Sequence, residues 1–389
     1  MPAEEHPMIG VLLNGRTLRG IRRGSTQHEA LQLYEHAAAR LGCRICYFRL
    51  RDISLRRRQV KAIIPDGPVG RYVTRMIPIP SVIHNRAIHL TRRAQARLGR
   101  LHHLRYYIYN RHTRYSKWFI HQLLSKHPDI VPHLPETRQA TPTAIHQMME
   151  RYDTLIIKPS NGSIGRGIMK LFKDGGRWHL QYRTAGMERT LRTRRGKRSK
   201  RRIRTRRWAV ISFRSKLPAA LKRLIRQRRF LVQQHIPLAC YMERPFDLRV
   251  SVQKGDSGSW QVTGIVGKAA PAKLFLTNVA QGGTVYTLEH LLAANPSLHP
   301  ERVRAEVERL ALLIADHLDR HLPNLADLGL DIGITQLGFP MFIECNCRDL
   351  RYSFLEGGLW EEWAAVYYQP ISYGQRIWLD RQVTSGTAN

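Results

Sequence analysis

The chain has 389 residues, of which 43% are hydrophobic and 8% aromatic, so it is long enough for two or three packed domains. Its composition excludes an intrinsically disordered or collagen-like protein. The 64 Lys and Arg residues outnumber the 29 Asp and Glu residues, which gives a formal net charge of +35. Such a chain needs anions nearby, from solvent, from a polyanionic partner or from a charged substrate.

Neither a signal peptide nor a membrane span is expected. Residues 1–20 lack an apolar segment of signal length, and no stretch reaches the roughly 20 apolar residues that a span needs. We therefore expect a soluble protein made in the cytosol.

The five cysteines are too few and too unevenly spread for a disulfide framework, so we expect reduced thiols. Cys43 and Cys46 have the spacing of a redox motif, but they lie in an apolar run and lack the second pair that a zinc site needs. Buried structural cysteines are the favoured interpretation.

The N-terminal part of the chain alternates strand and helix patterns. The expected elements are a strand at 9–14, a helix at 28–41, a strand at 44–50 and an extended segment at 78–83. Strand, helix, strand is typical of a small α/β domain with a parallel sheet. We place this domain at residues 1–115, because a basic, Tyr-rich stretch at 105–115 precedes a new helical pattern.

Residues 116–389 predict a second, larger domain. Its expected elements are helices at 116–125, 143–151 and 301–322, and strands at 154–158, 168–172, 230–234, 247–253, 260–266, 329–334 and 340–346. The apolar residues of the last helix recur at helical spacing, so they are assigned to the core. The strand at 154–158 runs into a glycine-rich turn at 159–167, whose backbone N–H groups can close on phosphates, although no Walker motif is present.

An arginine-rich insertion is expected near residues 189–229. Arg189–Arg207 holds twelve Lys or Arg in nineteen residues and cannot pack as a core. A solvated insertion is the favoured interpretation, and an arm that binds nucleic acid or another polyanion is the alternative. Only Trp208, at the edge of the run, could stack on a base, so nucleic acid is the less favoured partner.

Three oxygen-bearing side chains lie on apolar strands near the C-terminus. Glu344 and Asn346 share one face of their strand, and Asp331 precedes them on another strand. Buried carboxylates need a partner, which would be either Mg2+ with nucleotide phosphates or some of the many arginines. Lys158, at the end of its strand, is either exposed to solvent or a phosphate ligand.

The order of six short motifs is more informative than any one of them. They are Lys158–Gly167, Phe230–Ile236, Phe246–Val250, Thr277–Thr284, Gly329–Gly333 and Ile343–Asn346. This succession resembles the ATP-grasp superfamily over residues 135–354, and within it the YheC/YheD endospore-coat-associated family of spore-forming bacteria. The resemblance implies α/β plus α+β architecture: an N-terminal Rossmann-like, pre-ATP-grasp domain at 1–115, then a two-lobed ATP-grasp domain at 116–389.

The same resemblance implies an Mg-ATP site between two lobes and the chemistry of a carboxylate–amine ligase. ATP would phosphorylate a carboxylate, and an amine would attack the acylphosphate. The implied catalytic residues are Arg249 and Lys158, and the implied metal ligands are Asp331, Glu344 and Asn346. The implied nucleotide-binding residues are Lys158, Ser160, Asn161, Gly162, Ser163, Gly165, Gly167, Gln233, Gln234, Ile236, Asp247 and Asn278.

The partners implied are ATP, an unidentified carboxylate and amine, for which an acidic peptide or polymer is one option, and spore-coat proteins. The alternative function is a non-catalytic ATP-grasp protein with a structural role in the spore coat, so the expected location is the cytoplasm or the coat. Two positions depart from the family pattern. Cys347–Arg351 follows the Glu-x-Asn motif where relatives usually have a Pro-Gly-type turn, and Gln281 stands where related ligases often have a basic residue.

Overall fold

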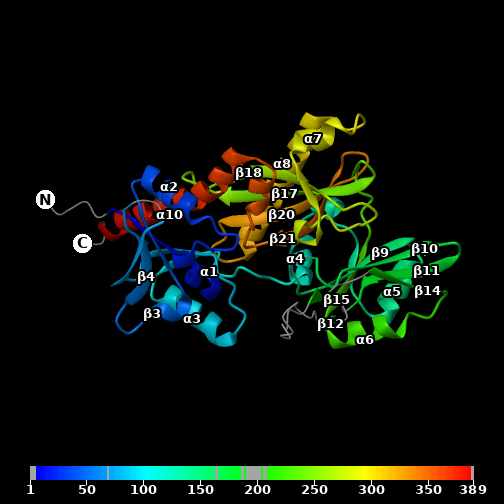
Figure 1. Cartoon of the computed structure of the whole chain (residues 1–389), viewed down its shortest axis with the longest axis horizontal. Helices are drawn as coiled ribbons and strands as arrows, with labels where there is room; N and C mark the ends of the chain where they lie inside the picture. The colour runs from blue at the N-terminus through cyan, green and yellow to red at the C-terminus, as the bar shows by residue number, and fades with distance from the viewer. Residues whose placement is uncertain are drawn as a thin grey trace, which may run out of the picture. The chain divides into compact units, whose positions relative to one another are not determined.

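The computed structural model describes residues 6–67, 70–162, 165–184, 188–189, 203–204 and 208–386 (Figure 1). The chain divides into two compact units. The first comprises residues 1–115, 122–133 and 238–389, and the second comprises residues 116–121 and 134–237. This division joins the N-terminal part to the C-terminal part, so the boundary at residue 115 stays a prediction.

The N-terminal sheet of the first unit has the order β3-β4-β2-β1-β6-β7, with β5 paired to β4. Its strands are β1 Met8–Leu12, β2 Arg44–Phe48, β3 Ile53–Ser54, β4 Gln59–Pro65, β5 Tyr72–Pro78, β6 Val82–Asn85 and β7 Tyr107–Tyr109. The strands β2, β1, β6 and β7 are parallel, as predicted, but β3, β4 and β5 add antiparallel pairings, so the sheet is mixed. The extended segment expected at 78–83 divides between β5 and β6, because Pro78 and Pro80 lack the N–H that continued pairing needs.

Helices pack on both faces of this sheet. They are α1 Gly15–Gly20, α2 Leu31–Arg40, α3 Arg92–His103 and, from the C-terminal end of the chain, α10 Trp360–Gly386. Figure 1 shows α2 beside α10, and their buried side chains share one core cluster, whereas Leu98 and Leu101 of α3 belong to another.

The sequence patterns did not predict α10, which has Pro370 in its interior. Pro370 has no N–H, so it cannot bond to the carbonyl of Val366 four residues earlier. That carbonyl accepts instead from Gln253 Nε2 at 2.9 Å, and the Pro370 carbonyl accepts from Tyr109 Oη at 2.7 Å. The carbonyls of Val366 and Pro370 thus connect α10 to strand β17, Arg244–Lys254, and to β7 through two tertiary hydrogen bonds.

The second unit is a six-stranded antiparallel sheet with helices against it. The strand order is β14-β11-β10-β9-β15-β8. The elements are β8 Thr137–Gln139, α5 Pro142–Met149, β9 Thr154–Pro159, β10 Met169–Asp174, β11 Arg177–Arg183, β14 Trp208–Phe213, α6 Ala219–Gln227 and β15 Phe230–Gln234. Helix α4, Lys117–Leu124, corresponds to the helix expected at 116–125. Its first residues belong to this unit.

Most of the arginine-rich run lies outside the described residues, so its predicted role is untested. Within it, the structure describes a pairing between β12, Glu188–Arg189, and β13, Ile203–Arg204.

A third sheet, in the first unit, has the order β19-β18-β17-β20-β21, with β16 paired to β17. Its elements are β16 Cys240–Tyr241, β17 Arg244–Lys254, β18 Trp260–Ala269, β19 Thr284–Tyr286, α7 Leu288–Ala293, α8 Pro300–His321, β20 Asp327–Ile334, β21 Pro340–Asn346 and α9 Tyr352–Glu356. The predicted helix at 301–322 is α8, and its apolar positions are all buried: Val303, Val307, Leu310, Ile314 and Leu318.

A buried ion network joins the N-terminal sheet to the third sheet. Asp327 Oδ2 lies 2.9 Å from Arg86 Nη1 and 2.6 Å from Arg351 Nη2. Arg86 also lies 3.1 Å from Glu29, and His84 Nε2 lies 3.4 Å from Asp327 Oδ2. None of these five residues is more than 2% exposed.

The basic residues of the network stabilise the charged form of Asp327. Burial alone would raise the pKa of Asp327, but Arg351, His84 and Arg86 hold that pKa well below its usual range. Burial lowers the pKa of His84 to about 4, so this histidine is neutral at pH 7. Asp327 is therefore ionised in a dry environment and depends on its two arginines.

All five cysteines are free, and Cys43 and Cys46 are buried, in keeping with a structural role. Burial raises the pKa of the Cys43 thiol to about 11, so this thiol is protonated and unreactive at neutral pH. In the described part of the chain, no helix has the length and apolarity needed to cross a membrane.

We predict that Asp327→Asn lowers the free energy of unfolding by about 3–5 kcal/mol, because it leaves two buried arginines without their counterion. Chemical denaturation of the parent and the variant measures this loss. The control is Asp316→Asn, which removes an exposed pair with Arg320 and should cost less than about 1 kcal/mol. Equal effects of the two substitutions would contradict the role of the network.

Candidate active site

The third sheet has one apolar face and one polar face. Along β17, Phe246, Leu248, Val250 and Val252 alternate with Asp247, Arg249, Ser251 and Gln253. The register places Asp247 opposite Lys268 of β18, Arg249 opposite Asp331 of β20, and Asp331 opposite Glu344 of β21. Charged residues of four adjacent strands therefore share the polar face.

Asp331 is the centre of this face. Its Oδ1 lies 2.6 Å from Lys268 Nζ and 3.3 Å from Arg249 Nη2. Its Oδ2 accepts from Asn346 Nδ2 at 3.4 Å. Lys268 Nζ also lies 3.0 Å from Asp247 Oδ1, so the lysine bridges two carboxylates.

Asp349 holds the other side of Arg249. The Arg249 Nη1 atom lies 3.5 Å from Asp349 Oδ1, and Ser251 Oγ donates to Asp349 Oδ2. Gly329 of β20 makes room for this arrangement, since a Cβ there would meet Arg249 Nη1 at 2.6 Å and the Asp349 carboxylate at an even shorter distance. Only glycine lets these two side chains cross β20.

Burial and ion pairing act in opposite directions on the pKa values of the cluster. Burial would lower the pKa of Lys268, but Asp247 and Asp331 outweigh it, so the pKa is raised. Burial also raises the pKa of Asp247 and of Asp349, and Lys268 and Arg249 respectively oppose this shift. Two fixed cations thus lie among several carboxylates in a dry site, where electrostatic interactions are strong.

The three predicted metal ligands, Asp331, Glu344 and Asn346, lie on the neighbouring strands β20 and β21. Two carboxylates and an amide oxygen suit Mg2+, which prefers oxygen ligands and keeps waters or phosphates in its remaining positions. Asp331 also pairs with the basic residues Arg249 and Lys268, and pairing with basic residues was the alternative to metal binding. The described residues contain no group of three or more His, Cys, Asp or Glu placed to hold a metal ion, so the metal assignment stays a prediction.

The loop of the motif Thr277–Thr284 is attached to the polar face. Thr277 Oγ1 donates to Asp247 Oδ2. The Asn278 side chain accepts from the Ala280 N–H at 3.0 Å and caps a short 3-10 turn, Val279–Gln281. Asn278 therefore shapes the loop in this structure, and its predicted contact with the nucleotide is untested.

In the second unit, Lys158 lies near the end of β9 and is buried. Leu155 and Ile157 belong to the core, so Lys158 lies on the opposite face of the strand. Burial and the charge of Lys158 lower the pKa of His121 to about 4. This lysine is therefore not the solvent-exposed strand end that was the alternative.

The described part of the glycine-rich turn is held by Lys117. Lys117 Nζ donates to the Gly162 carbonyl at 3.0 Å, and its N–H donates to the Ser160 carbonyl at 2.9 Å. Gly165 and Gly167 have positive φ angles of 62° and 79°, which suit glycine. Asn161 precedes Gly162 in the turn, and Ser163 lies outside the described residues.

Three of the predicted nucleotide-binding residues, Gln233, Gln234 and Ile236, lie at the end of β15 and just after it. Gln233 Nε2 donates to Thr137 Oγ1 at 2.7 Å, and Gln234 Oε1 accepts from the Glu136 N–H at 3.2 Å. These side chains tie β15 to the segment around β8. The Gln234 N–H donates to the Glu136 carbonyl at 2.9 Å, and the His235 N–H donates to the Thr154 carbonyl at 3.3 Å. The predicted contact of Gln233, Gln234 and Ile236 with the nucleotide stays a prediction.

Sequence reasoning missed several charged residues of these sites. Lys268 is a single lysine in an apolar strand, and the strand expected at 260–266 ended before it. Asp349 lies in the segment Cys347–Arg351, for which the sequence predicted no function. Lys117 belongs to no motif, and only its position in the first turn of a predicted helix could have indicated it.

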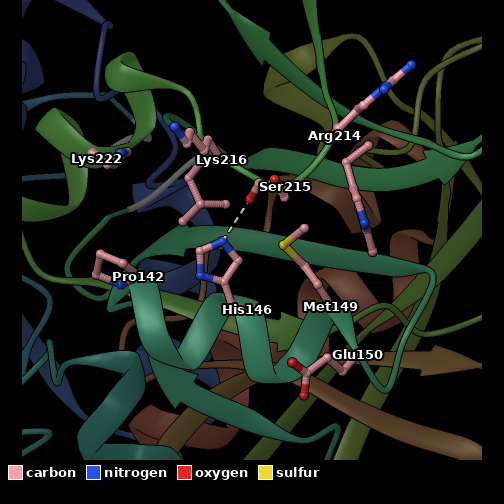
Figure 2. A pocket seen from close by; sticks show the side chains of 10 residues that line it. Pro142, His146, Met149, Glu150, Arg214, Ser215, Lys216 and Lys222 are labelled. Carbon is pink, nitrogen blue, oxygen red and sulfur yellow. Dashed lines mark hydrogen bonds between the residues drawn. The ribbon is translucent and has the colours of Figure 1, made fainter.

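The second unit also has a pocket of about 530 Å³ that contains none of the predicted site residues. Figure 2 shows His146 and Met149 of α5, with Glu150 just after the helix, on one side and Arg214, Ser215 and Lys216 on the other. His146 Nε2 lies 3.0 Å from the Ser215 carbonyl. The pocket is therefore separate from Lys158 and the glycine-rich turn.

The model of the YheC/D-like ATP-grasp family matches residues 106–377. Two similar proteins are the endospore coat-associated proteins YheD and YheC of Bacillus subtilis (strain 168). YheD is 29% identical over 246 residues, which cover 62% of this chain and 50% of YheD. YheC is 23% identical over 338 residues, which cover 85% of this chain and 88% of YheC. The matched part of the chain thus spans about half the length of YheD.

Solved structures show the same fold. The ATP-grasp ligase PsnB complexed with a minimal precursor has a TM-score of 0.50 and 14% identity, covering 90% of this chain and 95% of PsnB. The VanG D-Ala:D-Ser ligase from Enterococcus faecalis has a TM-score of 0.50 and 11% identity, covering 95% and 100%. The predicted fold class and family resemblance are confirmed.

We predict that Gly329→Ala lowers the free energy of unfolding by about 1–3 kcal/mol, because the new methyl group displaces Arg249 and Asp349. The control is Gly99→Ala in α3, where a Cβ meets no heavy atom within 4 Å. That substitution should be neutral or stabilise by up to about 1 kcal/mol. Denaturant titration of both variants tests this, and an unchanged stability of Gly329→Ala would contradict the tight crossing.

Proposed function

Since the chain belongs to the YheC/D-like ATP-grasp family, we propose that it binds Mg-ATP and joins a carboxylate to an amine through an acylphosphate. The observation that supports this most strongly is the polar face of the third sheet. There Arg249 and Lys268 are held beside Asp331 in a buried cluster. Such an arrangement suits the stabilisation of charge during phosphoryl transfer.

In this proposal, phosphate recognition in the second unit rests on Lys158, Lys117 and the turn at 159–167. Lys158 supplies a buried positive charge, and Lys117 fixes the turn through its bonds to Ser160 and Gly162. Backbone N–H groups of the turn would face the phosphates. The remaining turn residues assigned to the nucleotide are Asn161, Ser163, Gly165 and Gly167.

In the first unit, Asp331, Glu344 and Asn346 would hold Mg2+. When bound, Mg2+ supplies neutralisation of the charge on the β- and γ-phosphate oxygens. Arg249 would donate to the transferring phosphoryl group, and its own position is fixed by Asp331 and Asp349. Lys268 would be a second fixed cation beside it. Asp247 orients both the lysine and the loop at Thr277.

The substrates are a carboxylate and an amine, and an acidic peptide or polymer fits the net charge of +35. The names of the relatives support a link to the endospore coat. They also favour the second candidate, a coat protein that keeps the ATP-grasp fold without turnover. Turnover of ATP in the presence of carboxylates and amines distinguishes the two.

Thermal unfolding with ATP, in the presence and absence of Mg2+, tests the nucleotide site. A ligand at a hundred times its Kd should stabilise the protein by roughly 2.7 kcal/mol. We expect a metal-dependent shift in the parent and its loss in Lys158→Ala and Glu344→Ala. The control is Glu301→Ala, at an exposed position of α8, which should keep the shift. No shift of the parent at millimolar Mg-ATP would overturn the proposed function.

A further inference from the structure

We propose that the N-terminal sheet has a binding site of its own for a small phosphate-bearing molecule. The site is a pocket of about 610 Å³, a size typical of small-molecule sites. None of its lining residues belongs to the polar face of the third sheet, and all of them precede residue 106, where the family match begins. The inference therefore goes beyond the proposed ligase function.

The pocket lies where this fold leaves a crevice. Strand β1 pairs in parallel with β2 on one side and with β6 on the other. The chain leaves β1 toward β2 and later returns to β6, so the strand order reverses at β1. Open α/β sheets bind ligands outside the carboxyl ends of their strands at such a reversal. The lining residues Asn14, Arg49 and Ile88 follow the ends of β1, β2 and β6 respectively.

The lining is positively charged and has no acidic residue. Its basic residues are Arg19, Arg49, Arg51, His89, Arg93 and Arg97. Arg49 pairs with Asp52 at 2.6 Å, and Arg97 donates to the carbonyls of Leu50 and Ile53, so these two arginines hold the loop after β2 in place. The other three arginines are exposed and can turn their guanidinium groups to a ligand. Guanidinium groups match phosphate oxygens in pairs.

Two further features favour an anion here. Gly15 leaves space in the pocket, since a Cβ would meet only Arg19 Nη1 at 3.4 Å and Arg49 Cδ at 3.5 Å. Thr91, the N-cap residue of the twelve-residue helix α3, and Ala94, in its first turn, line the pocket, and helix N-termini attract anions.

Calorimetric titration of the full chain with pyrophosphate, at a constant ionic strength near 0.15 M, tests the site. The double variant Arg19→Gln/Arg93→Gln should bind at least about tenfold more weakly, because two charge-assisted contacts are lost. Gly15→Leu should weaken binding similarly without a change in charge, because its side chain fills the pocket. The matched control is Arg92→Gln/Arg100→Gln, which removes two exposed charges of α3 outside the lining and should change affinity less than about twofold.

The possible results distinguish binding in this pocket from unspecific attraction, from binding at the proposed nucleotide site and from a nucleic-acid surface. Equal losses in the pocket and control variants would mean unspecific attraction and would overturn the proposal. Loss of pyrophosphate binding in Lys158→Ala, with none in the pocket variants, would assign the anion to the proposed nucleotide site. Displacement of pyrophosphate by a single-stranded oligonucleotide in parent and pocket variants alike would indicate a nucleic-acid surface instead. Absence of binding in the parent would overturn the site and leave the ligase function intact.

Discussion

The buried carboxylate of Asp327 is the constraint on which the first unit depends. A carboxylate this far from water is stable only with its counterions in place, and they come from distant parts of the chain: Arg86 after β6, and Arg351 after β21. Arg86 also donates to the Asp349 carbonyl at 2.6 Å. Since Asp349 pairs with Arg249, the network extends from the N-terminal sheet to the candidate active site.

This connection explains what the segment Cys347–Arg351 does. Arg348 lies 3.3 Å from Glu29, Asp349 pairs with Arg249 and Ser251, and Arg351 pairs with Asp327. The segment therefore connects the polar face to the N-terminal sheet through hydrogen bonds and ion pairs. Carboxylates hold Arg249 and Lys268 in place. In the proposed function, little reorganisation would therefore be needed when charge develops during phosphoryl transfer.

Local patterns predicted much of the fold but little of the site. The strand at 230–234 and the core positions of α8 follow from apolar periodicity, which sequence shows directly. Helix α10 lacks a clear period and contains Pro370, so it forms through contacts with α2 and Gln253 that no local pattern shows. Lys268 enters the site only because the register of β17 and β18 sets it opposite Asp247. Motif order indicated Arg249 and Asp331 but could not show which carboxylates hold the arginine.

A crystal structure of the full chain with Mg2+ and a non-hydrolysable ATP analogue tests the central claim most directly. We expect the metal ion on Glu344, Asn346 and Asp331, with the terminal phosphate within hydrogen-bond distance of Arg249 or Lys268. The claim would be contradicted by a nucleotide bound elsewhere, with Asp331 still paired to Lys268 and Arg249 and no metal ion beside it.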